Sequence, residues 1–311
     1  MVNYSSYLSM VRDKELVEES KLLPEFVRNT DPIIQVSKVE KSSVPGFCFS
    51  EVWDNVFTEE ECKAIIDSLE KSGELSFWNP VDNESKDFRD VDTVESDMNL
   101  FSNFMWERIK CLFSHHKFSI SEDDEYSELD TIGEWRASGV YERILFGRYE
   151  KGGHFGPHTD GSVCIDANKR TFWTILLYLN SIPEEGGGAT SFINQKQKLQ
   201  KFHKDEDGRD RSIPENVLYK VQPKAGRVVA FFFADMHEGE PVYSGHKKYI
   251  IRTDILFNRV NPILTSDTDR KAYKMWIDAQ NIAERGDPDT AVSLFKKAFK
   301  LSPELASLLK C

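Results

Sequence analysis

The spacing of apolar residues predicts helices at both ends of the chain and short strands between them. Residues 58–72 carry apolar side chains at helical intervals, and residues 98–113 repeat this pattern. Thr58 followed three positions later by Glu61 has the form of a capping box, in which each residue satisfies a backbone N–H of the first helical turn. The first of these segments is therefore predicted to be a helix that begins just after Thr58.

Three polar stretches interrupt this pattern. Residues 1–45 are mixed in charge and broken by prolines, so we expect an N-terminal arm rather than a core element. Residues 82–97 and 121–130 are rich in acidic residues and show no periodicity. Runs of charge of this kind are usually solvated, and both stretches are predicted to be surface loops.

From residue 141 onward, short apolar segments alternate with glycine-rich or charged turns. Many short strands without helices between them are typical of a sandwich or barrel, so we expect a mainly β protein of the jelly-roll class with flanking helices. The predicted strands are 142–149, 171–180, 188–193, 217–221, 226–233 and 248–258.

Residues 263–311 return to helical spacing and predict a C-terminal helical hairpin whose two helices meet near Gly286 and Pro288. Small and apolar residues of the second helix fall at the spacings of a tetratricopeptide repeat. A single repeat has no neighbour against which to bury its face. Two interpretations stay open: a hairpin that packs on the main domain, or a surface that binds a partner protein.

Composition narrows the class of protein. The 311 residues include 52 acidic and 40 basic side chains, which gives a net charge of −12. This balance argues against a nucleic-acid binder, whose affinity depends on basic residues at phosphates. The five cysteines are widely spaced and form no CxxC pair, so neither a disulfide framework nor a zinc knuckle is indicated. No segment resembles a signal peptide or a membrane span, and we expect a cytoplasmic or nuclear protein.

The residues with chemical potential begin after a glycine-rich turn. His158 and Asp160 lie two positions apart, and such side chains share one face of an extended chain. His237 follows an apolar strand and precedes a turn into a basic strand. Together the three would form the two-histidine, one-carboxylate set that binds Fe(II) and leaves positions open for an oxygenase. The alternative is that His237 only ends a strand.

A 2-oxo acid that chelates such an iron would need a cation for its remote carboxylate. A guanidinium fork suits this role, and Arg252 is the first candidate, with Lys248 as the second. A structural salt bridge of Arg252 is the alternative. Tyr149 and Tyr178 could donate hydroxyl groups to the same carboxylate, although an ordinary core tyrosine explains either equally well.

Three segments, in this order, resemble the iron- and 2-oxoglutarate-dependent dioxygenases of the prolyl 4-hydroxylase type. They read YERILFGRYEKGGHFGPHTDGS, then TILLYLN with EEGGGATSF, then KAGRVVAFFFADMHEGEPVYSGHKKYIIRTDILF. The resemblance covers residues 46–262. It implies a double-stranded β-helix with Fe(II) held by His158, Asp160 and His237, with 2-oxoglutarate as co-substrate and L-ascorbate as reductant.

The resemblance also bears on the contacts to 2-oxoglutarate. Tyr149 and Tyr178 match tyrosines that contact this co-substrate in related hydroxylases. The basic residue of the family follows the distal histidine at a position for which Lys247 and Lys248 compete, whereas Arg252 matches the spacing of other branches.

The activity implied is the oxidation of 2-oxoglutarate to succinate and CO2, coupled to hydroxylation of a second substrate. We expect this substrate to be a protein side chain such as prolyl. Two alternatives remain: nucleic-acid demethylation by the same iron chemistry, and a jelly-roll module that binds a partner without catalysis.

Overall fold

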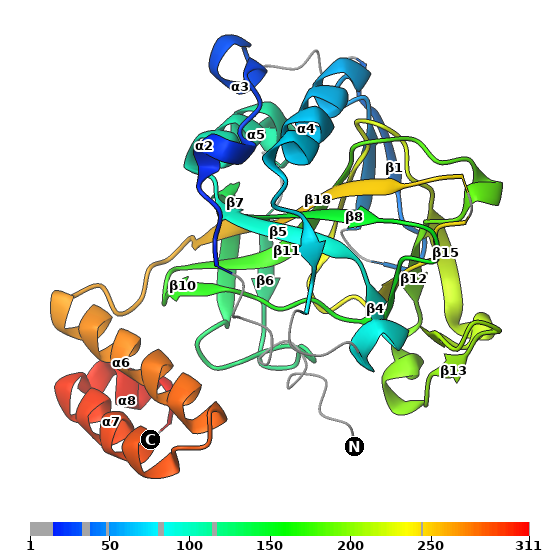
Figure 1. Cartoon of the computed structure of the whole chain (residues 1–311). Coiled ribbons are helices and arrows are strands. Elements are labelled where there is room, and N and C mark those ends of the chain that lie inside the picture. Colours follow the sequence, from blue (N-terminus) through cyan, green and yellow to red (C-terminus); the bar gives the residue numbers. More distant parts are fainter. Residues whose placement is uncertain are drawn as a thin grey trace. The chain divides into compact units, whose positions relative to one another are not determined.

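The computed structural model describes residues 15–32, 38–47, 50–79, 84–113, 117–243 and 245–310 (Figure 1). The chain divides into two compact units. The first consists of the described residues of Met1–Leu112, Gly139–Gly161 and Phe172–Ile255, and the second of those of Phe113–Ser138, Ser162–Thr171 and Leu256–Cys311. The domain boundaries expected after residues 45 and 262 remain predictions.

Two antiparallel sheets build the first unit, and the predicted jelly roll, or double-stranded β-helix, is confirmed. Along the larger sheet the strands follow the order β1 (Glu40–Ser43), β2 (Glu51–Asp54), β16 (Val228–Phe232), β11 (Lys169–Tyr178), β18 (Lys248–Arg259), β8 (Arg143–Tyr149), β5 (Asp92–Asp97) and β3 (Ser76–Phe77). Along the smaller sheet the order is β15 (Val217–Val221), β12 (Thr190–Ile193), β17 (His237–Gly239), β9 (His154–His158) and β4 (Arg89–Asp90).

Apolar side chains of both sheets meet in one core. Phe192 of the smaller sheet and Phe231 of the larger sheet pack edge to face, with ring centroids 5.4 Å apart. Tyr149, Tyr178 and Ile250 belong to the same cluster. Burial of large aromatic and branched side chains contributes most of the stabilising free energy in such a sandwich. The same core also fixes the strands that carry the candidate site.

Helices of the first unit follow the sequence pattern closely. The predicted helix after Thr58 is α4 (Glu59–Ser72), and its capping box with Glu61 is confirmed. Gly73 ends it with a φ of 68°, a left-handed conformation that glycine adopts without strain. The second predicted helix is α5 (Asn99–Phe113). Two short helices precede them, α2 (Glu19–Leu22) and α3 (Phe26–Asn29).

The prediction of a surface loop over residues 82–97 is wrong. Its second half forms β4 and β5, and β5 pairs with β8 inside the larger sheet. The acidic residues are tolerated there because arginines lie directly opposite them: Asp92 faces Arg148 and Asp97 faces Arg143. Both pairs are ion pairs, at 2.8 and 2.5 Å. Opposite charges on facing strands stabilise a sheet. The sequence of one strand does not reveal which residues face it, so this strand could not be predicted.

The second unit contains the predicted C-terminal helical hairpin. It consists of α6 (Asp267–Glu284) and α7 (Pro288–Leu301), and α8 (Pro303–Leu308) follows. Ala272, Tyr273, Ala298 and Leu305 are buried in its core. Two further strands of this unit, β6 (Lys117–Ile120) and β10 (Cys164–Asp166), pair with β7 (Gly133–Val140) and with the start of β11. The pairing of β6 with β7 was not expected from the sequence.

Short elements complete the described chain. They are the hairpin of β13 (His203–Lys204) with β14 (Asp210–Arg211), and the 3-10 turns η2 (Glu84–Asp87), η3 (Glu184–Gly186), η4 (Gln195–Leu199) and η5 (Pro214–Asn216). Among the helices described, none combines the length and the apolar character needed to cross a bilayer.

A buried ion pair joins α4 to α5 and can be tested. Arg108, only 4% exposed, binds both carboxylate oxygens of Glu61 at 2.6 and 2.8 Å and donates from Nε to the carbonyl of Pro32. We expect Arg108→Met to lower the free energy of unfolding by about 3–5 kcal/mol, because it leaves the Glu61 carboxylate without its partner. Lys63→Met, which removes the exposed pair with Asp67, should cost less than about 1 kcal/mol in the same urea titration.

Candidate metal centre

Two strands of the smaller sheet bring the predicted ligands together. β8 ends at Tyr149, and a tight turn leads into β9, whose last residue is His158. A side chain at Gly153 in this turn would place its Cβ 2.9 Å from the carbonyl oxygen of Glu150, so the turn requires glycine. β9 pairs with β17 so that His158 lies directly opposite His237. Asp160 follows just beyond the end of β9.

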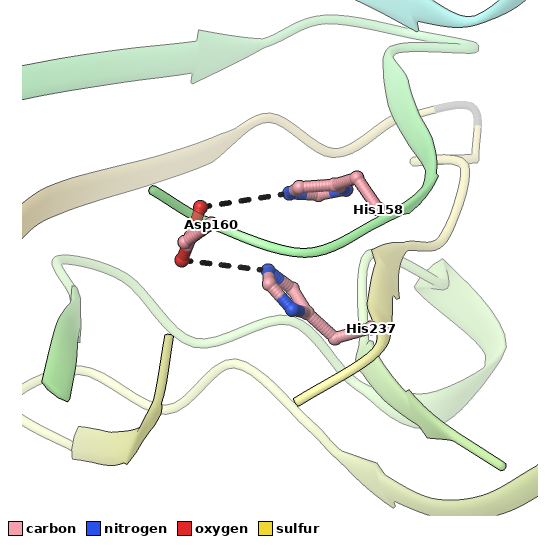
Figure 2. A group of neighbouring side chains, drawn as sticks. All are labelled: His158, Asp160 and His237. Carbon is pink, nitrogen blue, oxygen red and sulfur yellow. Dashed lines mark ion pairs between the residues drawn. The ribbon is translucent and has the colours of Figure 1, made fainter. Parts of the chain in front are cut away.

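Figure 2 shows the three side chains pointing toward one another. Nε2 of His158 lies 3.9 Å from one carboxylate oxygen of Asp160, and Nε2 of His237 lies 3.8 Å from the other. The two imidazole rings have centroids 4.2 Å apart. Within the described part of the chain, these three residues form the one group of metal-ligating side chains with donor atoms within 4.8 Å of one another.

The hydrogen bonds of the two imidazoles orient their free nitrogens toward this point. Nδ1 of His158 lies 2.7 Å from the carbonyl oxygen of Gly156, and Nδ1 of His237 lies 2.9 Å from that of Asp235. A carbonyl only accepts, so each Nδ1 carries the proton and each Nε2 presents a lone pair in the neutral ring. Burial and the nearby His237 lower the pKa of His158 well below its ordinary value. Two lone pairs and a carboxylate therefore converge, which fits a divalent cation such as Fe(II).

A set of polar contacts holds the carboxylate of Asp160. The Thr174 hydroxyl donates to it at 2.6 Å, and Nη2 of Arg252 lies 3.5 Å from its other oxygen. Burial opposes the charged form, but Arg252 and the two histidines outweigh it and hold the pKa of Asp160 below its ordinary range. Arg252 is itself held by Asp254, at 3.1 Å. Asp160 thus stays ionised and oriented, as a metal ligand must be.

The candidate anchors for a co-substrate differ sharply in their surroundings. Arg252 is already engaged by Asp160 and Asp254. Lys247 is exposed and pairs with Glu150 at 2.8 Å. Lys248 is 2% exposed, and among the residues described no carboxylate lies within ion-pair distance of it. Lys247 immediately precedes β18, and adjacent residues of an extended chain point to opposite faces, which explains why Lys247 is exposed and Lys248 is buried.

Two aromatic rings surround Lys248. Its ammonium nitrogen lies 5.1 Å from the ring centroid of Tyr149 and 5.5 Å from that of Tyr178. Tyr149 lies directly opposite it on β8, and the Tyr178 hydroxyl donates to the Thr190 hydroxyl at 2.7 Å. Burial lowers the pKa of Lys248 to about 7. The structure therefore brings both predicted tyrosines to Lys248, and not to Arg252.

Sequence reasoning missed two residues beside the metal centre. Thr174 lies in an apolar strand, where a hydroxyl group usually needs a buried hydrogen-bond partner, and this could have identified it from the sequence. Arg89 lies in the stretch predicted to be an acidic loop, and no sequence signal marks it. His154, four residues before His158, has both ring nitrogens at hydrogen-bond distance from the carbonyls of Gly152 and Asp87, which indicates a structural role.

Removal of one ligand should abolish metal binding without unfolding the protein. We expect Asp160→Ala to weaken Mn(II) or Fe(II) binding by more than about 100-fold, beyond the 10–100-fold that loss of an outer partner costs. Thr174→Val, which removes such an outer partner, should fall within that smaller range. Anaerobic titration calorimetry measures both. His203→Ala is the control because His203 lies far along the chain in β13, bonded to a carbonyl. Equal affinity in wild type and Asp160→Ala would exclude this metal centre.

Comparison with known proteins agrees with this geometry. Residues 144–253 match the model of the 2OG-Fe(II) oxygenase superfamily. No curated protein matches the chain significantly. Solved structures similar to it include the viral collagen prolyl hydroxylase of Paramecium bursaria Chlorella virus-1 in complex with 2OG. That similarity has 19% identity and a TM-score of 0.41, and it covers 70% of this chain and 99% of the viral one.

Two further prolyl hydroxylases are similar at low identity. A Pseudomonas putida prolyl-4-hydroxylase shares 13% identity at a TM-score of 0.41, over 75% of this chain and 99% of the other. A Trichoplax adhaerens prolyl hydroxylase was solved in complex with a peptide of hypoxia inducible factor. It shares 16% sequence identity at a TM-score of 0.44, and the similarity covers 76% of this chain and 88% of the other.

The matched segment and the side-chain cluster coincide. His158, Asp160 and His237 all lie within residues 144–253, and so do Lys248 and Arg252. The donor set is the one that Fe(II) oxygenases use to keep coordination positions open. Residues 144–253 are therefore similar to the 2OG-Fe(II) oxygenase superfamily both in sequence and in carrying the donor set of an Fe(II)- and 2-oxoglutarate-dependent oxygenase.

Proposed function

We propose that this oxygenase hydroxylates a protein side chain, with prolyl as the first candidate, and releases succinate and CO2 from 2-oxoglutarate. One observation carries the proposal: the Nδ1 atoms of His158 and His237 donate to backbone carbonyls, and their Nε2 atoms converge with the carboxylate of Asp160. Prolyl is the first candidate because the motifs around His158 and His237 resemble those of prolyl 4-hydroxylases. L-ascorbate, as a reductant of the metal, is part of the same proposal.

His158, Asp160 and His237 would hold the iron. Iron bound in this way supplies the activation of dioxygen by which 2-oxoglutarate is decarboxylated and a C–H bond of the second substrate becomes C–OH. The chain contributes orientation and exclusion of water. Phe155 stacks on the His158 ring at 3.6 Å, and the ring centroid of Phe231 lies 4.6 Å from that of His237. Such apolar walls limit side reactions by keeping solvent from the reacting groups.

Lys248 is the proposed anchor of the remote carboxylate of 2-oxoglutarate, in preference to Arg252. A buried ammonium group without a carboxylate partner is costly, and a bound carboxylate would compensate it. Tyr149 and Tyr178 flank this ammonium group and complete the proposed subsite. Arg252 already shares its charge between two aspartates, so it has less to offer a ligand.

Turnover tests the reaction directly. Purified protein with Fe(II), ascorbate and 2-oxoglutarate should release succinate, and this release should fall to background in His158→Ala and Asp160→Ala. Incubation with a cell extract should add one oxygen atom to specific peptides, detected as a +16 mass shift by mass spectrometry, as hydroxylation of a C–H bond requires. His203→Ala serves as the matched histidine control. Succinate release that persists without the metal ligands contradicts the proposed reaction.

The two adjacent lysines offer a matched pair for the anchor. We expect Lys248→Met to raise the KM for 2-oxoglutarate by roughly 10–150-fold, since a hydrogen bond to a charged group contributes about 1.5–3 kcal/mol. Lys247→Met removes an exposed charge of the same kind and should leave KM within about twofold. Steady-state succinate release measures both. A larger effect of Arg252→Gln than of Lys248→Met would return the anchor to Arg252.

The pKa of Lys248 predicts how affinity depends on pH. Burial lowers this pKa to about 7, and a carboxylate beside the amine favours its charged form. The free protein must therefore carry a protonated Lys248 to bind 2-oxoglutarate. Affinity should be constant well below pH 7 and fall by about tenfold per pH unit above it. Titration of Mn(II)-loaded protein with 2-oxoglutarate measures this, and Lys248→Arg, whose charge persists, should show no such decline.

A further inference from the structure

A second cation lies close to the metal centre and is not used by the reaction described above. Arg89 belongs to β4, directly opposite Phe155 of β9. Its guanidinium carbon lies 4.4 Å from the ring centroid of Phe155 and 4.8 Å from that of Trp78. The ring of Phe155 also stacks on that of His158, with centroids 3.6 Å apart. Phe155 thus contacts both the Arg89 charge and an iron-ligating imidazole.

Among the described residues, the Arg89 side chain contacts aromatic rings and no carboxylate. In the part of the chain that the structure describes, its side chain makes these two cation–π contacts and no ion pair, and its Nε is buried without a hydrogen-bond partner. Burial lowers its pKa, while Tyr149, Glu95 and Asp160 raise it and Arg252 lowers it. These groups are therefore near enough to interact electrostatically, but none of them pairs with the guanidinium group.

An unpaired cation at this position calls for an explanation. Arg89 is partly buried, and removing an ion from water is costly, while cation–π contacts return only part of that cost. Other arginines of this unit are paired, as Arg108 is with Glu61 and Arg227 with Asp54. The chain carries an excess of acidic residues, 52 against 40 basic ones, so a partner would have been easy to supply. The free side of the fork is thus available to a ligand.

The ligand is not the remote end of 2-oxoglutarate if Lys248 binds it. A second anion beside the iron would then belong to the substrate that is hydroxylated. The side chain of Arg252 is 30% exposed and lies beside Asp160. Its positive charge also acts on Arg89, whose pKa it lowers. A guanidinium fork binds a carboxylate through two parallel hydrogen bonds, which also fixes the orientation of the bound group.

We infer that Arg89 binds an acidic side chain of the protein substrate, close to the residue that is hydroxylated. The inference rests on the proposed function and extends it: the enzyme selects peptides with Asp or Glu beside the target. The rings of Trp78 and Phe155 both contact the guanidinium group, and the Trp78 indole donates to the Arg89 carbonyl at 2.6 Å. These contacts restrict the motion of the guanidinium group and so reduce the entropy that binding a carboxylate would cost.

Direct binding of an acidic peptide tests this without turnover. The probe is blocked tetraglutamate, with tetraglutamine as the neutral comparison, added to full-length protein loaded with Mn(II) and 2-oxoglutarate. Trp78 fluorescence reports the binding because its ring contacts Arg89, and Trp78→Phe identifies its part of the signal. We expect saturable, salt-sensitive binding of tetraglutamate only, weakened at least about tenfold in Arg89→Gln and less in Arg89→Lys.

Controls separate a binding role from a structural one. Arg143→Gln removes a guanidinium that is already paired with Asp97 and should bind tetraglutamate as wild type does. Circular dichroism shows whether each variant is folded. If Arg89→Gln does not fold, Arg89→Lys, which keeps the charge but not the guanidinium fork, replaces it as the test variant. Equal binding of the two peptides, or unchanged binding of tetraglutamate in folded Arg89 variants, overturns the inference.

Turnover without a second substrate distinguishes failure of the inference from failure of the proposed function. Succinate release and 2-oxoglutarate affinity should be the same in Arg143→Gln as in wild type, since Arg143 is paired with Asp97. A large loss of 2-oxoglutarate affinity in Arg89→Gln would overturn the inference by making Arg89 a co-substrate contact. Absence of succinate release in the wild type would refute the proposed reaction, while tetraglutamate binding would still report on Arg89.

Discussion

The antiparallel pairing of β9 with β17 is the constraint on which the metal centre depends. It sets His158 directly opposite His237, although the two lie far apart in the sequence. Each imidazole is then turned by a carbonyl two residues before it in the chain, so both ligand orientations are properties of local backbone. Asp160 is oriented by side chains of other strands, Thr174 of β11 and Arg252 of β18. The fold therefore brings the three donors to one point and orients each of them.

Three basic side chains near the candidate metal centre differ in how many carboxylates they contact. Arg252 is compensated by Asp160 and Asp254, and it stabilises the ionised ligand. Lys248 and Arg89 contact aromatic rings and no carboxylate among the described residues. An uncompensated buried charge is costly in the free protein and favourable once a carboxylate binds. We interpret the first position as part of the metal centre and the other two as binding sites for two different acids.

Much of the fold could be predicted from the sequence because its signals are local, and the three candidate iron ligands that the sequence suggested lie together in the structure. Thr58 and Glu61 define a helix start within four residues, and alternation defines most strands of the sheets. β5 could not be predicted, since its acidic residues are compatible with a strand only when Arg143 and Arg148 stand opposite them. Arg89 had no signal for the same reason: its significance lies in rings contributed by other segments. Pairings between distant segments are not visible in one-dimensional periodicity.

The lysine doublet at the start of β18 has a consequence for how the strand tolerates error. Alternation sends Lys247 outward to Glu150 and Lys248 inward to the tyrosines. A slip of one residue in register would exchange these two roles and still deliver an amine to the interior. The same slip would turn Ile250 and Arg252 to the opposite face, removing an apolar residue from the core and a guanidinium from Asp160. The two lysines would therefore not distinguish the two registers. Ile250 and Arg252, which follow them, favour the observed one.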